Sequence, residues 1–425
     1  MSAARIGVSQ GTALYVGAIL GAGILALPSL AAQEAGPASV LAWALLLLFC
    51  VPVAASFAAM STHHPDGGGV ATFVSKAYGH RASAMVGYWF YFALPAGAPV
   101  TAYVGGQYVA DAVGGGQGAA LGFAGCLLAA AFGTNAVGLR VSGRVQLILV
   151  GLLGLLLLTA CLLALPDADP GNMTPFAPHG LLAVGPAASL LFFSFAGWEA
   201  VTHLAGEFRN PARDLRLVTL LTLVVIGVLY VGLALTCVLV LGPELAESEV
   251  PLSLLLEAGI GGAANAFTAT LAAMLTLGTM NAYLAGASRL GAALARDGSL
   301  PAWMAKGNLP GEIPRRSLGV LAVLSVLVSA VALGVGADLG SVMLAASACF
   351  IAVTVAGLVA GVKLLPSRRP VWYGAILAAA VMGVVLLFSG IFLLVPVALA
   401  GGALWYTRRG ARPLPATEKA PATSV

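Results

Sequence analysis

The sequence predicts an all-α integral membrane protein with twelve transmembrane helices, and three observations support this fold class. Hydrophobic residues make up 60% of the 425 positions and charged residues only 8%, whereas an ordinary soluble domain is about 25% charged. The chain also divides into twelve apolar runs, each close to the length of about 20 residues that crosses a bilayer as a helix. Finally, the basic residues all fall on one side of the topology that these runs define.

The predicted spans cover residues 8–33, 38–61, 82–110, 119–138, 145–165, 182–204, 215–242, 262–288, 318–335, 340–362, 371–389 and 391–407. Only Ser389 and Gly390 separate the last two runs. A single helix over both runs would be about 55 Å long, although the hydrocarbon core is only about 30 Å thick. Two short spans therefore fit better than one long helix.

Charge provides an independent test of this topology. If the N-terminus is cytoplasmic, all 20 Lys and Arg residues lie in cytoplasmic segments, and the outer segments carry only acids such as Asp167, Glu244 and Glu249. This positive-inside bias predicts a multi-pass protein of the cell membrane with both termini in the cytoplasm. The basic residues are scattered, so they do not indicate a nucleic-acid partner. The five cysteines lie in apolar runs and predict neither a disulfide framework nor a metal site.

The first span is interrupted by glycines at Gly21-Ala22-Gly23, before Pro28. A helix break inside a bilayer frees backbone groups that have no water to bond, so it usually serves a site. Close helix packing through small residues is the alternative. The run from Gly21 to Ala26 also fits a G-x-G-x-x-A dinucleotide fingerprint, which we reject because no strand precedes it.

The third span carries Pro95 and Pro99 at mid-depth. Two prolines should kink this helix and free some of its carbonyls. The segment is therefore expected either to line a cavity or only to bend the helix.

The sixth span contains the second interruption, Phe192 through Glu199, and His203 follows one turn later. An ionisable residue inside a membrane is by default a functional candidate. Because Glu199 and His203 are four residues apart, they would share one helix face, and the alternative is that they only satisfy each other.

The two interruptions lie five spans apart, in the first and the sixth. Because five is odd, a repeat of five spans is inserted upside down relative to the first. Inverted repeats with a discontinuous helix in each half place their substrate site at the bilayer midplane. We therefore expect one transmembrane domain over residues 1–407, with repeats at 8–165 and 182–362 and extra helices at 371–407. The Arg-, Pro- and Ala-rich tail 408–425 is expected to be disordered.

Several stretches carry a family resemblance: Gly21 to Pro28, the glycine-rich loop from Pro65 to Gly79, Phe195 through Asp214, and Ser288 through Gly298. They resemble the amino acid–polyamine–organocation (APC) superfamily, and within it the bacterial exporters of methionine and branched-chain amino acids. The resemblance implies a LeuT-like core of five plus five helices with two additional C-terminal helices. It also implies that Phe193 is an aromatic gate over the substrate.

The chemistry of the two breaks matches an α-amino acid. The half-helix that begins at Ala22 to Ile24 would present free N–H groups to a carboxylate, and carbonyls near Ser194 to Ala196 would accept from an ammonium. The surrounding side chains are apolar and favour a neutral hydrophobic substrate. The predicted substrate-binding residues are Ala18, Gly21, Ala22, Gly23, Ile24, Phe193, Ser194, Phe195, Ala196, Trp198 and Asn281.

These features predict a secondary transporter of neutral hydrophobic amino acids, with Glu199 and His203 coupling transport to protons. Sodium held near Ser288 is an alternative coupling ion. An ion-independent exchanger or facilitator and a transporter-like sensor are alternative functions. An enzyme is disfavoured because no nucleophile, metal or paired-carboxylate motif is present. No cofactor or metal is expected, and the partners are the amino acid, the proton and the lipid bilayer.

Overall fold

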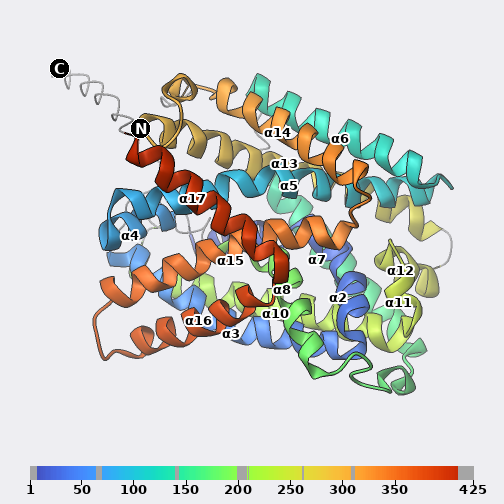
Figure 1. Ribbon diagram of the computed structural model, residues 1–425. Coiled ribbons are helices and arrows are strands. Elements are labelled where there is room, and N and C mark those ends of the chain that lie inside the picture. Colours follow the sequence, from blue (N-terminus) through green and yellow to red (C-terminus); the bar gives the residue numbers. More distant parts are fainter. Residues whose placement is uncertain are drawn as a thin grey trace.

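The computed structural model describes residues 7–63, 69–138, 143–198, 208, 210–260, 263–307 and 312–409. The secondary structure of these ranges is helical, without a β-strand. Figure 1 shows the long helices lying side by side, with α4 (Gly69–Tyr78) at one end of the bundle and α11 (Glu244–Glu247) and α12 (Pro251–Ile260) towards the other.

Each of the twelve predicted spans overlaps a helix. The first span is divided into α1 (Val8–Ile19), the 3-10 helix η1 (Ala22–Leu25) and α2 (Leu27–Ala35). The next four are α3 (Ser39–His63), α5 (His80–Ala112), α6 (Gln117–Val137) and α7 (Gly143–Ala164), and the sixth is α8 (Val184–Phe195). The last six are α10 (Pro211–Leu241), α13 (Ala263–Arg296), α14 (Arg315–Gly334), α15 (Leu339–Leu364), α16 (Pro370–Leu387) and α17 (Leu394–Arg408). Short 3-10 helices occupy Gly36–Ala38, Leu165–Asp167, Pro170–Met173, Leu181–Ala183, Ala302–Ala305 and Gly390–Leu393.

Among the described residues, seven helical segments are long and apolar enough to cross a membrane: Leu27–Thr62, Gln117–Val137, Arg213–Leu241, Arg315–Gly334, Leu339–Leu364, Pro370–Leu387 and Gly390–Arg408. Many of their large apolar side chains face outwards. Leu48, Val228 and Val323 are each about 60% exposed, which water would disfavour but lipid tails accept. The chain is therefore a multi-pass membrane protein.

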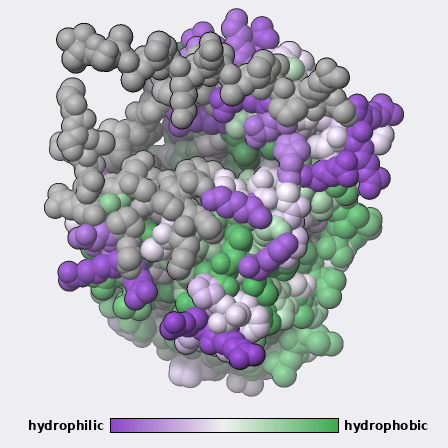
Figure 2. Space-filling model, turned by 90° about the vertical axis from the view of Figure 1, so that its left-hand side faces the viewer, coloured by the Kyte–Doolittle hydropathy of each residue, from purple (hydrophilic) through white to green (hydrophobic). Residues whose placement is uncertain are grey.

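The end of the bundle that carries α4 is rich in hydrophilic side chains. Figure 2 shows this end face-on, with hydrophilic residues over it and hydrophobic residues along the flank. Lys76, Lys363 and Arg408 lie in the last turns of α4, α15 and α17. This end corresponds to the predicted cytoplasmic side, and the predicted disordered tail lies, apart from its first two residues, outside the described residues.

Helix α5 runs through the bundle without a break, although Pro95 and Pro99 lie inside it. The Thr101 hydroxyl donates to the Gly97 carbonyl at 2.8 Å. Tyrosines anchor both ends of α5: the Tyr88 hydroxyl donates to the Ser299 carbonyl at 2.7 Å, and the Tyr108 hydroxyl donates to the Leu25 carbonyl at 2.8 Å. The second contact ties α5 to the interrupted first span.

Candidate functional site

The first interruption lies between Ile19 and Ala22. Leu20 leaves helical geometry (φ −74°, ψ 69°) and Gly21 is extended (φ −83°, ψ 173°). The first hydrogen bond of η1 joins the Ile24 amide to the Gly21 carbonyl at 3.3 Å. The amides of Ala22 and Gly23 precede it and so have no intrahelical acceptor. A helix start with free N–H groups therefore exists at the predicted position.

The second interruption follows Phe195. Ala196 is extended (φ −65°, ψ 144°), and its amide donates to the Phe192 carbonyl at 2.9 Å. Gly197 has a φ of 134°, a conformation that is accessible essentially only to glycine. The chain therefore leaves α8 abruptly, as the glycine in this apolar run predicts.

Tyr230 of α10 joins the two interruptions. Its hydroxyl lies 2.9 Å from the Ile19 carbonyl oxygen and 3.1 Å from the Ser194 carbonyl oxygen. One hydroxyl hydrogen is shared between these two acceptors. The ring is fully buried and packs edge-on against Trp43 and Phe195, with centroids 5.1 and 5.2 Å away. The carbonyl ends of α1 and α8 therefore meet at a single side chain.

Gly23 permits a close approach between the two interrupted helices. A Cβ atom on Gly23 would lie 2.7 Å from the Ser194 Oγ and 3.0 Å from Cδ1 of Phe193. Real Cβ atoms essentially never approach another heavy atom as closely as 2.7 Å. A larger residue at position 23 would therefore force the Ser194 or Phe193 side chain to move.

A cavity of about 40 Å³ lies where the interruptions meet, and we call it the central cavity. Four helices besides the first span contribute to it: α5, α8, α13 and α15. Its lining consists of Ile19, Gly21, Gly23, Leu94, Gly97, Ala98, Thr101, Phe193, Ser194, Thr279, Met280, Tyr283 and Phe350. No charged side chain is among them. The buried Ser194 Oγ has no hydrogen-bond partner within the described protein, so the central cavity holds an unused polar group.

Aromatic rings close one side of the central cavity. The Phe193 ring centroid lies 6.3 Å from that of Phe350, and the Tyr283 ring lies 6.5 Å from Phe350 on another side. Phe193 also faces Gly97, whose Cβ, if present, would lie 3.5 Å from the ring. The Pro95–Pro99 segment of α5 thus lines a cavity, one of the two outcomes expected for it.

The structure brings four of the predicted binding residues into this lining: Gly21, Gly23, Phe193 and Ser194. Ile24, Phe195, Ala196 and Trp198 are buried in the surrounding core. Ala22 contributes its backbone at the start of η1, and Ala18 lies in α1. Glu199 and His203 lie outside the described residues.

Asn281 lies away from the central cavity. Its Oδ1 accepts hydrogen bonds from the Thr134 hydroxyl and the Asn135 amide of α6, both at 2.8 Å. The Asn281 side chain therefore serves the packing of α13 on α6. Thr101, Thr279, Tyr283 and Phe350 line the cavity instead, and nothing in the sequence distinguishes them from other residues of apolar helices.

A helical membrane bundle in which two interrupted helices meet around a closed cavity is the architecture of secondary transporters. The amino acid permease family model matches residues 6–411. The chain belongs to this family of permeases, which confirms the resemblance seen in the sequence and makes the protein a transporter and not an enzyme.

Two relatives and one solved structure illustrate the relationship. The uncharacterized amino acid permease YecA of Bacillus subtilis is 33% identical, and the alignment covers 94% of each chain. The L-methionine/branched-chain amino acid exporter YjeH of Escherichia coli is 28% identical over 86% of this chain and 87% of its own. The fold resembles the crystal structure of MhsT in complex with L-phenylalanine, with a TM-score of 0.61, 15% identity, and coverage of 92% of this chain and 98% of that chain.

Proposed function

We propose that this permease carries neutral hydrophobic L-amino acids, such as methionine or the branched-chain amino acids, across the cell membrane by alternating access. The two inverted repeats at 8–165 and 182–362 would rock around the central cavity, with both termini in the cytoplasm. The observation that carries the proposal is the meeting of two helix interruptions, joined by Tyr230, at a cavity that contains the unpaired Ser194 hydroxyl. The substrates in the name of YjeH, and the L-phenylalanine in the MhsT structure, support this substrate class.

The amides of Ala22 and Gly23 are suited to the substrate carboxylate, because they are free N–H groups at the positive end of a helix. The carbonyl end of α8 is suited to the ammonium. The described residues of the lining include no charged side chain, and burying an unpaired charge among them would be costly. A zwitterion with an apolar side chain matches this environment better than a cationic or acidic substrate.

The central cavity must expand to admit such a substrate. Its 40 Å³ is far below the roughly 300–1,000 Å³ of a typical ligand pocket. Phe193 is half-buried and packs on Gly23, Gly97 and Phe350. We propose that Phe193 swings away to open the site and returns over the bound substrate.

Coupling to protons is assigned to Glu199 and His203 from their sequence positions. An imposed pH gradient should then drive uptake by the purified protein in liposomes. The double substitution Glu199→Gln with His203→Ala should abolish gradient-driven uptake and leave counterflow exchange intact. Undiminished gradient-driven uptake would remove the role of this pair.

The function itself is tested with a panel of labelled amino acids in proteoliposomes, with and without pH and sodium gradients. Methionine, leucine, isoleucine and valine should be transported, and arginine and glutamate should not. Failure of every hydrophobic amino acid would contradict the substrate class. Counterflow without any gradient dependence would identify an ion-independent exchanger.

A further inference from the structure

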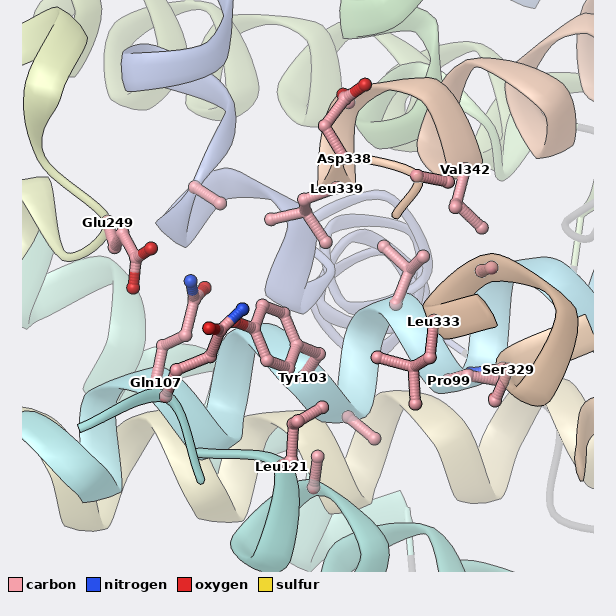
Figure 3. A pocket seen from close by; sticks show the side chains of 18 of the residues that line it. Pro99, Tyr103, Gln107, Leu121, Glu249, Ser329, Leu333, Asp338, Leu339 and Val342 are labelled. Atoms are coloured by element: carbon pink, nitrogen blue, oxygen red, sulfur yellow. The ribbon is translucent and has the colours of Figure 1, made fainter. Parts of the chain in front are cut away.

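A second, much larger cavity lies nearer the end of the bundle that carries α11 and α12. It encloses about 670 Å³ between α2, α5, α6, the end of α14 and the start of α15, and we call it the outer cavity. Part of its wall is apolar, with Leu30, Leu121, Leu128, Leu333 and Val342 among its residues. Gln107, Tyr103 and Glu249 also line it, and Figure 3 shows all three around the same space. It shares no lining residue with the central cavity.

Gln107 indicates that this cavity takes a hydrogen-bond donor. Its side chain is only 5% exposed, and its Oε1 has no partner within the described protein. A buried acceptor left unpaired costs about 1–3 kcal/mol, so a ligand that donates to it would remove that cost. Glu249 lines the same cavity as Gln107 and Tyr103 (Figure 3), so a carboxylate and the unpaired amide oxygen both belong to this lining.

Charge restricts the ligand further. Within the described part of the chain, the lining has no Lys, Arg or His, and its two acids are Glu249 and Asp338. The Asp338 carboxylate accepts from the Ser341 amide at 2.8 Å and the Ser341 hydroxyl at 2.6 Å, where it caps α15. Glu249 is exposed and can pair with a cationic ligand. A carboxylate on the ligand would find only acids among the charged groups of this lining.

We propose that the outer cavity binds a hydrophobic primary amine, an ammonium group on an apolar body without a carboxylate. The ammonium would donate to the Gln107 Oε1 and pair with Glu249, and the hydrocarbon would lie against the apolar wall. This site is separate from the amino acid site proposed above and does not depend on it.

Binding there would affect transport from a distance. Residues that line the outer cavity also hold α2 against the segment before α12: the Ser29 hydroxyl donates to the Ser248 carbonyl at 2.6 Å, and the Gln33 amide donates to the Ala246 carbonyl at 2.7 Å. A ligand wedged between α2, α5 and α15 would hold these elements in place. The amine therefore acts as a non-competitive inhibitor.

The test measures binding of 3-methylbutylamine to the purified full-length protein by calorimetry, with 3-methylbutanol as a matched ligand that lacks the ammonium. Glu249→Gln and Gln107→Leu should each weaken amine binding about tenfold, the usual size of a lost charge-assisted hydrogen bond. Glu247→Gln, which changes an exposed acid of α11 outside the cavity lining, should leave amine binding unchanged. Leucine should not displace the amine.

Each other result overturns the proposal. Equal binding of the alcohol and the amine would show that the cavity accepts any apolar molecule. An effect of Glu247→Gln as large as that of Glu249→Gln would indicate only general attraction by the acidic end. Competitive displacement by leucine would place the amine in the central cavity. Because Glu249 is exposed, its substitution keeps the test valid even if Gln107→Leu disturbs folding.

Discussion

The two cavities of this permease differ in size, charge and construction. The central cavity of about 40 Å³ lies where two interrupted helices meet, and no charged side chain is among the described residues that line it. The outer cavity of about 670 Å³ lies among continuous helices and α2, and acids and amides line it. Volume alone would select the outer cavity as the transport site. The free backbone groups to which we assign the substrate are found at the central one, so our proposal follows the helix breaks and not the cavity volume.

The central cavity is small because it is closed by packing. Phe193 lies over Gly23 and Gly97, and its ring meets Phe350. Aromatic rings of this kind can rotate out of the way, but the hydrogen bonds of Tyr230 fix the backbone beneath them. The following predictions distinguish the movable aromatic ring of Phe193 from the backbone that Tyr230 holds in place, and they are given in order of decreasing effect.

The largest effect is expected for Gly23→Val. The new side chain would collide with Ser194 and Phe193, and such overpacking costs about 1–3 kcal/mol. Transport should be abolished, because the helix ends can no longer meet. Gly21→Ala is the matched control, since its Cβ would lie 3.5 Å from Thr279 and should be tolerated. Equal transport by both variants would contradict the close approach.

Tyr230→Phe should have the next largest effect. The ring keeps its packing on Trp43 and Phe195, but the Ile19 and Ser194 carbonyls lose their shared donor. Unsatisfied buried acceptors cost about 1–3 kcal/mol, so the thermal midpoint should fall and the transport rate should drop at least about tenfold. Normal transport by this variant would show that the site does not need the hydrogen bonds from Tyr230 to the Ile19 and Ser194 carbonyls.

Tyr108→Phe and Tyr88→Phe should shift the conformational balance in opposite directions. Tyr108 tethers α5 to Leu25 and also accepts from the Leu252 amide at 3.2 Å, whereas Tyr88 holds Ser299 near the other end of α5. Losing either contact should favour opening at its own end by about 1 kcal/mol.

The readout is labelling of a cysteine introduced at Thr279, in a protein without its native cysteines, by an impermeant thiol reagent. Tyr108→Phe should speed labelling from outside the cell, and Tyr88→Phe from the cytoplasmic side. Identical changes from both sides would argue against two separate gates.

Ser194→Ala should have the smallest effect on folding. Its Oγ has no partner in the described protein, so stability should stay constant or rise slightly. The Michaelis constant for the substrate should rise about tenfold if the hydroxyl bonds the amino acid. Ser347→Ala is the contrast, because it removes a 2.6 Å hydrogen bond to the Ser189 carbonyl and should lower stability without that change in affinity.

Sequence patterns located the helices and the positions of both breaks. Apolar runs of bilayer length gave the twelve predicted spans, and the glycines near Gly21 and at Gly197 marked where the backbone departs from a helix. These features are local, because they depend on residues that are neighbours in the chain. The inverted repeat of five plus five helices stays a prediction.

The sequence could not supply the contacts between distant elements. Tyr230 is a single tyrosine in an apolar helix, and its role depends on the ends of α1 and α8, which are far away in sequence. Asn281 was predicted to bind the substrate, but its side chain is hydrogen-bonded to Thr134 and Asn135 of α6 and does not line the central cavity. The outer cavity could not be predicted from neighbouring residues in the sequence, because its walls come from five different helices.

Filling each cavity in turn tests the central claim most directly. Gly21 has a backbone conformation that valine also adopts, and its Cβ would make only ordinary contact, so we expect Gly21→Val to fill the central cavity and to keep the fold. Gly125→Val adds the same side chain to the outer cavity, where a Cβ meets nothing within 4 Å. In proteoliposomes, Gly21→Val should abolish methionine and leucine transport, and Gly125→Val should retain it. Retained transport in Gly21→Val and loss in Gly125→Val would contradict the assignment of the substrate to the helix breaks.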